Sequence, residues 1–450
     1  MTLTRSRYLL LGRRPYRDPA GRRVRMAYSA RRATLFALDE STADALGRGA
    51  FDVMDAAQLA RLRSLAAVVD AGEDELADVL RRYREGSADP GVRGFTIMPT
   101  AYCNMACDYC GQEHVKGGIH RDRVERLASR VEATVADPAT RHVGVTWFGG
   151  EPLLAMRVIR ELSARFVAAA DAAGVGYTAR MATNGSLLTA RTLQILHDEC
   201  RLGAMDVTID GPAEVHDRRR VKRNGIGSFH RTVAVLAEAV RSGAVPRLRI
   251  GIRVNVDAEN EDVVEELLTD LACLGFGSPQ VELHLMPVHS WGNDVSAVEL
   301  AARRMAEREV AWLRLARSLG LGAPDLPTAL KRTTCRATSV QGEVVDPAGR
   351  VYSCSEHPLV PGVRDTGVVA TLAELPGAAP RPRGPFDDWY EQVGDGVQQC
   401  GRCPLLPVCG GSCPKLWREG HLPCPTLKFN WEDRIDLAAR RLGYAPVDAG

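Results

Sequence analysis

The spacing of apolar residues changes along this chain and divides it into three parts. In the middle part, short apolar or β-branched runs alternate with longer segments in which apolar residues recur every three or four positions. The predicted strands lie at residues 94–98, 144–148, 178–182, 205–209, 248–254 and 281–286. Because strands that alternate with helices pair in parallel, we expect an α/β fold with a parallel sheet or an open barrel. Its functional loops should follow the carboxyl ends of the strands.

The first part, residues 1–90, predicts a small module of its own. It begins with short β-like runs, turns helical and ends in a linker that contains Gly, Ser and Pro, which gives a β3α3-like unit. The expected strands lie at residues 7–11, 24–29 and 34–38, and the expected helices at residues 56–69 and 73–83. The linker lies at residues 86–94. On sequence alone the module is either a structural cap or a domain whose edge strands accept a peptide strand.

The last part, residues 326–450, follows a helical segment at residues 295–319, so the middle part spans residues 94–325. This last part is rich in Pro, Gly and Cys and has few long apolar periods. We therefore expect metal ligation to replace much of the apolar core there.

Three cysteines, Cys103, Cys107 and Cys110, follow the first strand of the middle part in a C-x3-C-x2-C pattern. This spacing presents three thiolates to one center, one fewer than a structural zinc ion or a fully ligated cluster has. A [4Fe–4S] cluster on three cysteines keeps one iron free for a cofactor or substrate, so the pattern indicates a reactive center. The alternative, a structural zinc site, needs a fourth ligand nearby, and the nearest His, His114, lies in a polar Gly-rich run.

Composition narrows the class of protein. With 450 residues, 45% hydrophobic and 25% charged residues and a net charge of +2, the chain is long enough for two or three domains and shows no general preference for nucleic acid or a membrane surface. No apolar run approaches the ~18 residues needed to span a bilayer, and the apolar run near the start is too short for a secretory signal, which predicts a cytoplasmic protein. In that reducing compartment the twelve cysteines indicate metal centers rather than disulfides. Cys200 and Cys273, which stand alone, are expected to be buried core residues.

A second motif, FGGEP at residues 148–152, follows the second strand. Together with the cysteine loop and with Tyr109, the aromatic residue before the third cysteine, it resembles the radical S-adenosylmethionine (radical SAM) superfamily. The resemblance implies a partial (β/α)6 barrel and S-adenosylmethionine as cofactor, with Tyr109 in the cofactor site and Gly149, Gly150 and Glu151 around the methionine amino group. Glycines let a ligand approach the backbone, and a carboxylate accepts hydrogen bonds from an ammonium group.

Polar residues at further strand ends fit the same site. By resemblance, Asn184, Thr208 and Arg253 contact the ribose hydroxyls and the methionine carboxylate. Asp210 is a candidate general base and equally a ribose or turn ligand. The other interpretation of these residues is loop capping, since Asn-Gly is itself a turn signal. The basic run at residues 216–223 is expected to be a solvated face rather than a grip on an acidic peptide or the cofactor.

Seven more cysteines occupy the last part, and their spacing resembles the SPASM extension of peptide-modifying radical enzymes. Four plus three cysteines make two auxiliary [4Fe–4S] clusters, so the resemblance implies three clusters in all. By resemblance, the fully ligated cluster is held by Cys400, Cys403, Cys409 and Cys424, and the cluster with a vacant iron by Cys335, Cys354 and Cys413. The alternative is a zinc ribbon on Cys400, Cys403, Cys409 and Cys413, which leaves the other three without a role.

The function that the resemblance implies is that of an oxidoreductase that matures a ribosomally made precursor peptide (RiPP maturation), with a carbon–carbon (cyclophane-like) or thioether crosslink as the expected product. The N-terminal module then resembles the winged-helix-like domain that holds a precursor's leader. The alternatives are oxidation of a Cys or Ser to formylglycine as in sulfatase maturases, peptide epimerisation, and a non-catalytic metal-binding interaction protein. The expected partners are the peptide and a reductant such as flavodoxin or ferredoxin, with no nucleic acid and no membrane.

Overall fold

The computed structural model describes residues 2–375 and 377–447. Within these residues the largest sheet has nine strands in the order β13-β12-β10-β9-β8-β6-β14-β15-β16. Its first six strands are parallel and form the middle part of the chain; in chain order they are β6 (Val92–Ile97), β8 (His142–Trp147), β9 (Gly176–Thr183), β10 (Leu202–Thr208), β12 (Arg249–Val256) and β13 (Val281–Pro287). Each overlaps its predicted strand, so the α/β prediction is confirmed, and the open parallel sheet fits a partial barrel.

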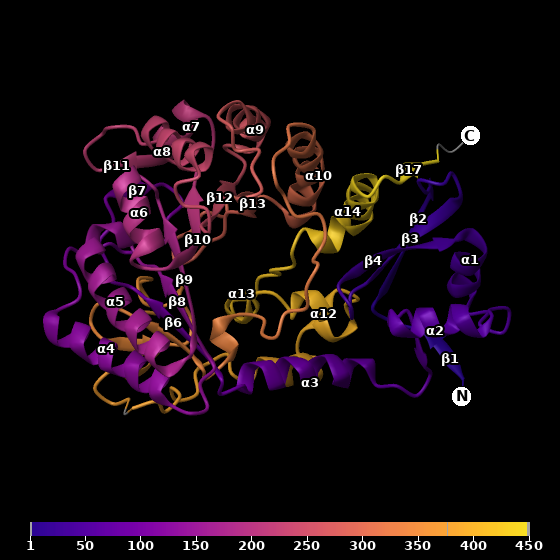
Figure 1. Cartoon of the computed structure of the whole chain (residues 1–450), viewed down its shortest axis with the longest axis horizontal. Helices are drawn as coiled ribbons and strands as arrows, with labels where there is room; N and C mark the ends of the chain where they lie inside the picture. The colour runs from indigo at the N-terminus through magenta and orange to yellow at the C-terminus, as the bar shows by residue number, and fades with distance from the viewer. Residues whose placement is uncertain (1, 376, 448–450) are drawn as a thin grey trace.

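Helices cover the outer face of this sheet (Figure 1). They are α4 (Arg121–Ala136), α5 (Met156–Ala173), α6 (Ala190–Asp198), α8 (Phe229–Ser242), α9 (Val264–Cys273) and α10 (Ala302–Ser318). Alternate strand residues face them: Ala179 and Met181 of β9 belong to the apolar core and are 3% and 1% exposed. The residues between them face the other way, and the Arg180 side chain is 58% exposed although β9 lies inside the sheet. The concave face is therefore polar and open to water.

The last part of the chain joins this sheet. The strand β14 (Gly342–Val345) pairs in parallel with β6, and β15 (Arg350–Tyr352) and β16 (Val368–Thr371) extend the sheet in antiparallel fashion. Short apolar runs between Gly and Pro residues carry no sign of which strand they will pair with, so the sequence did not predict this extension. It places the C-terminal cysteines beside the first barrel strand.

A buried ionic group fastens β14 to the barrel. Glu343 of β14 is fully buried between Arg93 of β6 and Arg130 of α4, which are each 3% exposed. Its carboxylate oxygens lie 2.5 and 3.2 Å from two nitrogens of Arg130 and 3.3 Å from one of Arg93. Both guanidinium groups also donate to backbone carbonyls at residues 377 and 378, at 2.6 Å. One carboxylate balances one of the two buried positive charges, and the carbonyl dipoles of residues 377–379 help to stabilise the other.

The N-terminal module has the predicted three antiparallel strands, β2 (Leu9–Arg17), β3 (Arg23–Ser29) and β4 (Thr34–Asp39), followed by α1 (Glu40–Arg48), α2 (Ala56–Ser64) and α3 (Glu75–Ala88). Two predictions were wrong in detail. The helix expected at 56–69 ends at Ser64, because Val68–Asp70 forms β5 and pairs with β1 (Leu3–Arg5). The linker expected at 86–94 shrinks to residues 89–91, because α3 continues to Ala88. A strand from the C-terminus, β17 (Ala445–Pro446), covers β2, which leaves β4 at the other edge.

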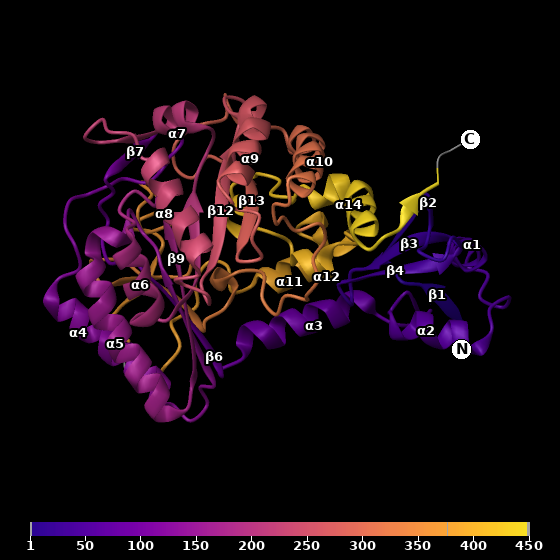
Figure 2. The same cartoon turned by 45° about the horizontal axis from the view of Figure 1, so that its top comes forward.

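The C-terminal part lies between the barrel and the N-terminal module in both views (Figures 1 and 2). It contains α11 (Trp389–Gly394), α12 (Leu406–Cys409), α13 (Pro414–Arg418) and the longer α14 (Leu427–Arg441). Its apolar residues share a core with the N-terminal module, in which Tyr83 of α3 stacks on Tyr390 of α11 at 5.3 Å. The expectation that metal ligation replaces a core here was therefore wrong: the core exists, but its other half comes from residues more than 300 positions earlier.

Among the described residues, none of the helices is both long enough and apolar enough to cross a bilayer.

Replacing Glu343 by Gln should lower the free energy of unfolding by about 3–5 kcal/mol, because two buried guanidinium groups lose their counter-charge. Urea unfolding measures this. The control is Asp365→Asn, which removes a carboxylate that is 77% exposed and pairs with Arg350; it should change stability by less than about 1 kcal/mol. Equal, small effects of the two substitutions would contradict the role of Glu343.

Candidate active site

The three cysteines Cys103, Cys107 and Cys110 lie in the loop that follows β6, with Cys103 buried and the other two half-buried. Part of this loop forms β7 (Met105–Cys107), which pairs with β11 (Arg220–Lys222). Burial raises the pKa of the Cys103 thiol to about 11 and also raises the pKa of Cys107 and Cys110. The thiols are therefore protonated at neutral pH unless a metal center binds them and displaces the protons.

The turn at residues 148–152 packs directly on the cysteine loop. A Cβ on Gly150 would lie 2.3 Å from the carbonyl oxygen of Tyr102, and Gly149 has a φ of +124°, which favours glycine. The Glu151 N–H donates to the same Tyr102 oxygen at 2.9 Å. The two motifs that the sequence singled out are therefore one structural unit.

Glu151 is fully buried at the start of the short 3-10 helix Pro152–Ala155, and burial raises the pKa of its carboxyl. One carboxylate oxygen accepts from the Leu153 N–H and the Thr183 hydroxyl, and the other accepts from the Asn184 N–H at 2.8 Å. A carboxylate has about four acceptor positions, so the second oxygen can accept one more hydrogen bond, for example from an ammonium group. Glu151 also joins the loop after β8 to the end of β9.

The loop after β9 returns to the cysteines. Asn184, 6% exposed, donates from its side chain to Asn104 at 2.9 Å and points the same group toward the Cys103 sulfur at 3.7 Å. Thr208 and Arg253 are half-buried and lie opposite each other in the β10–β12 register, where Arg253 donates to Asn255 at 2.8 Å. The structure thus places Asn184 beside the cysteines, with Thr208 and Arg253 on two neighbouring strands.

Asp210, directly after β10, is fully buried in a hydrogen-bond network. One carboxylate oxygen accepts from the Asn255 N–H at 2.7 Å, and the other accepts from the Tyr109 hydroxyl and from Arg220. Arg220 also donates to the Tyr109 oxygen, and Asn255 does so at 3.1 Å. Burial raises the pKa of Tyr109 well above its usual value, so its hydroxyl stays protonated. This arrangement makes Asp210 an anchor for Tyr109 and Arg220 rather than a free base.

The basic run at 216–223 is only in part a solvated face: Arg218 and Arg223 are exposed as expected, but the expectation was wrong for His216, Arg219 and Arg220. His216, Arg219 and Arg220 are at most 6% exposed. Arg219, at the end of α7 (Ala213–Arg219), pairs with Asp257 at 2.6 Å. Burial raises the pKa of Cys107, and the positive charge of Arg220 acts in the opposite direction and lowers it. A cation therefore lies near the Cys107 sulfur. The charges of His216, Arg219 and Arg220 suggested exposure to solvent, so their burial was not predicted from the sequence. The one signal in the sequence was their position shortly after the strand end that carries Asp210.

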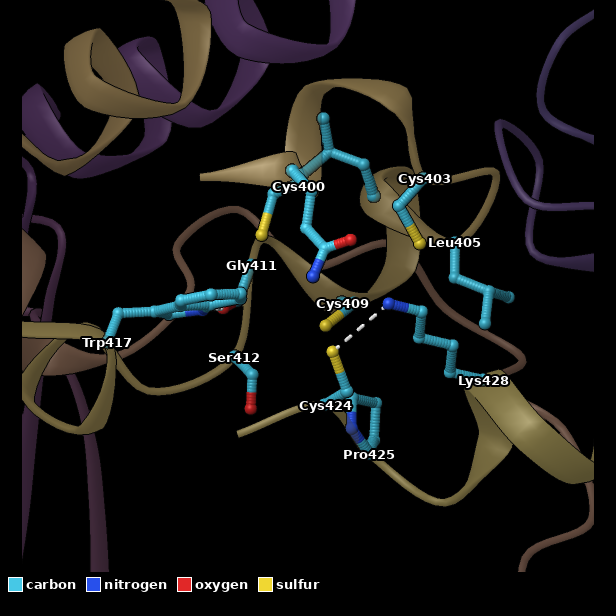
Figure 3. A pocket seen from close by; sticks show the side chains of 12 residues that line it. Cys400, Cys403, Leu405, Cys409, Gly411, Ser412, Trp417, Cys424, Pro425 and Lys428 are labelled. Carbon is cyan, nitrogen blue, oxygen red and sulfur yellow. Dashed lines mark hydrogen bonds between the residues drawn. The ribbon is translucent and has the colours of Figure 1, made fainter. Parts of the chain in front are cut away.

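Four C-terminal cysteines, Cys400, Cys403, Cys409 and Cys424, line one pocket (Figure 3). Cys400 lies in the 3-10 helix Gln399–Arg402 and Cys403 directly follows it; Cys409 ends α12, and Cys424 lies in the segment before α14. Burial raises the pKa of Cys400 to about 12 and that of Cys409 to about 11. The described residues that line the pocket include Leu405, Trp417 and Lys428 but no carboxylate or imidazole. A donor set of four thiols in a mostly apolar wall fits a fully ligated iron–sulfur cluster.

Cys413 does not line this pocket, which disfavours the zinc ribbon that would use Cys413 in place of Cys424. Moreover, no three Cys, His, Asp or Glu side chains in the described part of the chain converge on a single metal ion. Cys413 lies with Cys335 and Cys354 instead: burial raises the pKa of Cys354, and the neighbouring charges of Glu356, Cys335 and Cys413 add to this effect.

The remaining two cysteines differ from each other. Cys200 is fully buried, as predicted. Cys273 is exposed at the end of α9, so its prediction as a core residue was wrong: the buried face of α9 consists of Val264, Leu267, Leu268 and Leu271, and Cys273 lies on the opposite face.

Comparison with known proteins agrees with this geometry. Residues 97–271 match the family described as the radical SAM superfamily. The Serine-type anaerobic sulfatase-maturating enzyme of Bacteroides thetaiotaomicron is 29% identical over 139 residues, which cover 29% of this chain and 32% of that protein. An uncharacterized protein of Synechocystis sp. is 30% identical over 146 residues, which cover 30% of this chain and 35% of that protein. The chain thus spans about a third of the length of the curated relatives it matches.

Among solved structures, native anSMEcpe with bound AdoMet and the Kp18Cys peptide has a TM-score of 0.57 and 15% identity, and the match covers 78% of this chain and 98% of that one. At this identity the likeness concerns the fold. It extends beyond residues 97–271, and the Cys-rich C-terminal part fits a SPASM domain.

His216 should make the protein less stable as the pH falls from about 6.5 to 4. Its Nδ1 accepts from the Asp210 N–H, and burial lowers the pKa of the imidazole to about 4. The folded protein therefore stays neutral at His216 while the unfolded chain takes up a proton below pH 6.5. The stabilising effect is complete above pH 6.5 and is lost toward pH 4, by about 3 kcal/mol in all.

Urea unfolding at pH 7 and pH 5 checks this, with a smaller pH effect expected in His216→Asn than in the wild type. As a control, His120→Asn removes an imidazole that is 77% exposed and should leave the pH effect unchanged. If His216→Asn shows the full pH effect of the wild type, the buried imidazole is not its source.

Proposed function

We propose that this chain, which carries a radical SAM domain over residues 97–271, is a radical SAM/SPASM maturase that modifies a ribosomally made precursor peptide. The observation that carries this proposal is the contact between the two motifs: the turn with Gly150 and Glu151 packs on the backbone of the cysteine loop. A site for a three-cysteine cluster and a site for an ammonium group therefore lie side by side. That is the arrangement a cofactor chelated by a free iron requires.

Each residue of the site has a role in this proposal. A [4Fe–4S] cluster on Cys103, Cys107 and Cys110 supplies, when bound, the electron that cleaves S-adenosylmethionine to methionine and a 5′-deoxyadenosyl radical, which takes a hydrogen atom from the substrate. The backbone at Gly149 and Gly150 and the second oxygen of Glu151 accept from the methionine ammonium group.

The remaining site residues orient the cofactor. Asn184, Thr208 and Arg253 bind the ribose and the carboxylate of S-adenosylmethionine. Asp210 holds Tyr109 and Arg220 in place, and Arg220 favours the thiolate form of Cys107.

The proposed substrate is a peptide, for two physical reasons. The concave face of the barrel is polar and open, with Arg180 paired to Asp206 at 3.2 Å, and so can admit a hydrated polar chain. In addition, β4 ends its sheet without a neighbouring strand on one side among the described residues, so it can pair with an extended leader segment. A crosslink, carbon–carbon or thioether, is the proposed product.

Oxidation of a Cys or Ser to formylglycine is the second candidate, supported by the sequence match to a sulfatase-maturating enzyme. Asp210, the residue considered as its base, has both carboxylate oxygens engaged by Tyr109, Arg220 and Asn255, which disfavours that role. We place the protein in the cytoplasm, with flavodoxin or ferredoxin as the reductant and auxiliary clusters on the two C-terminal cysteine groups.

Replacing Cys103, Cys107 and Cys110 together by Ala should abolish the formation of 5′-deoxyadenosine, because no cluster remains to deliver the electron. The measurement is chromatography after anaerobic reconstitution with iron and sulfide and incubation with dithionite and S-adenosylmethionine. Cys273→Ala is the matched control, since it removes an exposed cysteine outside every group and should retain full activity. Reconstituted wild-type protein that makes no 5′-deoxyadenosine would overturn the proposed function.

The product is identified by co-expression with short reading frames adjacent to the gene. A crosslink lowers the peptide mass by two hydrogens, epimerisation leaves the mass unchanged, and formylglycine reacts with a hydroxylamine probe. A modified peptide that reacts with the probe would replace the crosslink proposal by the second candidate.

A further inference from the structure

Lysine is scarce in this chain, and its positions are not random with respect to cysteine. Of the 58 basic residues Lys and Arg, only five are lysines: Lys116, Lys222, Lys331, Lys415 and Lys428. Three of them fall between residues 331 and 428, the stretch that also holds all seven C-terminal cysteines. Because arginine serves as the cation nearly everywhere else, a lysine at these positions points to a need for a compact ammonium group rather than a planar guanidinium.

Of the lysines between residues 331 and 428, Lys428 is the one that contacts a cysteine sulfur directly. Its Nζ lies 3.3 Å from the sulfur of Cys424 and projects into the pocket lined by Cys400, Cys403, Cys409 and Cys424 (Figure 3). Lys428 is the one charged side chain among the described residues that line this pocket. The indole N–H of Trp417, which also lines it, is already used by the carbonyl of Gly411 at 2.8 Å. Lys428 is therefore the side chain best placed to donate to a sulfur here.

The position of Lys428 is not explained by the stability of its helix. It lies in the first turn of α14 (Leu427–Arg441), a turn that contains no acidic residue. The backbone is not helical at Asn430, so Lys428 lies in a short turn ahead of the main part of α14. The contact that the structure gives the Lys428 ammonium group is the Cys424 sulfur, which is a thiolate when it binds a cluster.

We propose that Lys428 raises the reduction potential of the [4Fe–4S] cluster held by Cys400, Cys403, Cys409 and Cys424. This rests on the proposed function only in so far as that cluster is present. Four thiolates on an oxidised cluster core give a net charge of about −2, which becomes −3 when one electron is added from an external one-electron carrier; no bond breaks and no proton is needed. The ammonium hydrogen bond to Cys424 stabilises the more negative state, and the apolar wall with Leu405 and Trp417 strengthens its effect.

The role of Lys428 is thus that of a positioning residue that acts through Cys424. A higher potential makes this cluster a better electron acceptor. A substrate radical must lose one electron when an oxidised product forms. The higher potential allows the cluster on Cys400, Cys403, Cys409 and Cys424 to accept that electron.

The test compares Lys428→Met, Lys428→Gln and Lys428→Arg in a full-length background in which Cys103, Cys107, Cys110, Cys335 and Cys354 are Ala, so that this cluster alone gives the signal. The midpoint potential is measured by electron paramagnetic resonance during anaerobic titration with dithionite. At a fixed potential near the midpoint, Lys428→Met should lower the ratio of reduced to oxidised cluster about tenfold, because a charged hydrogen bond is lost. Lys428→Arg keeps the charge and should lower it less.

Two comparisons keep the outcome decisive. Lys116→Met, which removes an exposed lysine outside the pocket, should leave the midpoint unchanged. If Lys428→Met fails to assemble the cluster, Lys428→Gln, which keeps a neutral donor, provides the midpoint; loss of the cluster in all three variants would mean that Lys428 serves assembly and would overturn the proposal.

Iron and sulfide analysis separates this inference from the proposed function. A parent protein with Lys428 that binds no cluster at these four cysteines contradicts the assignment of an auxiliary cluster, and the role of Lys428 with it. A full cluster whose midpoint is the same in the parent and in Lys428→Met contradicts the role of Lys428 alone.

Discussion

The buried carboxylate of Glu151 is the interaction on which the rest of the site depends. It accepts from Thr183 and from the backbone of Asn184, while its own N–H donates to Tyr102 in the cysteine loop. Three loops that follow three neighbouring strands are thereby held at one point. A fully buried carboxylate without these donors would cost several kcal/mol, so the loops cannot separate without a large penalty. The contact also requires that residue 150 has no side chain, because a Cβ on Gly150 would push the two motifs apart.

In both cysteine-rich regions the protein places a cation near sulfur. Burial raises the pKa of Cys103 and Cys400, so these side chains are neutral thiols in an empty site and thiolates in a loaded one. Arg220 stands near Cys107 and Lys428 contacts Cys424. Each cation has its own local support: Asp210 and Tyr109 hold the guanidinium, whereas the ammonium extends from the first turn of a helix. The same electrostatic requirement is thus met by a rigid network in one site and by a single long side chain in the other.

The three parts of the chain are not independent units. The strand β14 continues the barrel sheet, with Glu343 buried between Arg93 and Arg130, and the apolar core of the C-terminal part is completed by the N-terminal module through Tyr83 and Tyr390. A segment with few long apolar periods can therefore still be buried, because residues from elsewhere cover it. This shared packing also sets where the auxiliary cysteines lie relative to the barrel.

The sequence by itself determined the six parallel strands, the two motifs at their carboxyl ends and the existence of two cysteine-rich regions, because periodicity and ligand spacing are encoded within short windows of the chain. It gave no indication that Arg220 is buried beside Tyr109 or that Cys273 is exposed. Only the tertiary structure decided these, since each depends on which distant segments meet: Arg220 and Tyr109 are 111 residues apart, and Glu343 and Arg93 are 250 apart. Strand order and register, which no local pattern specifies, bring such pairs together.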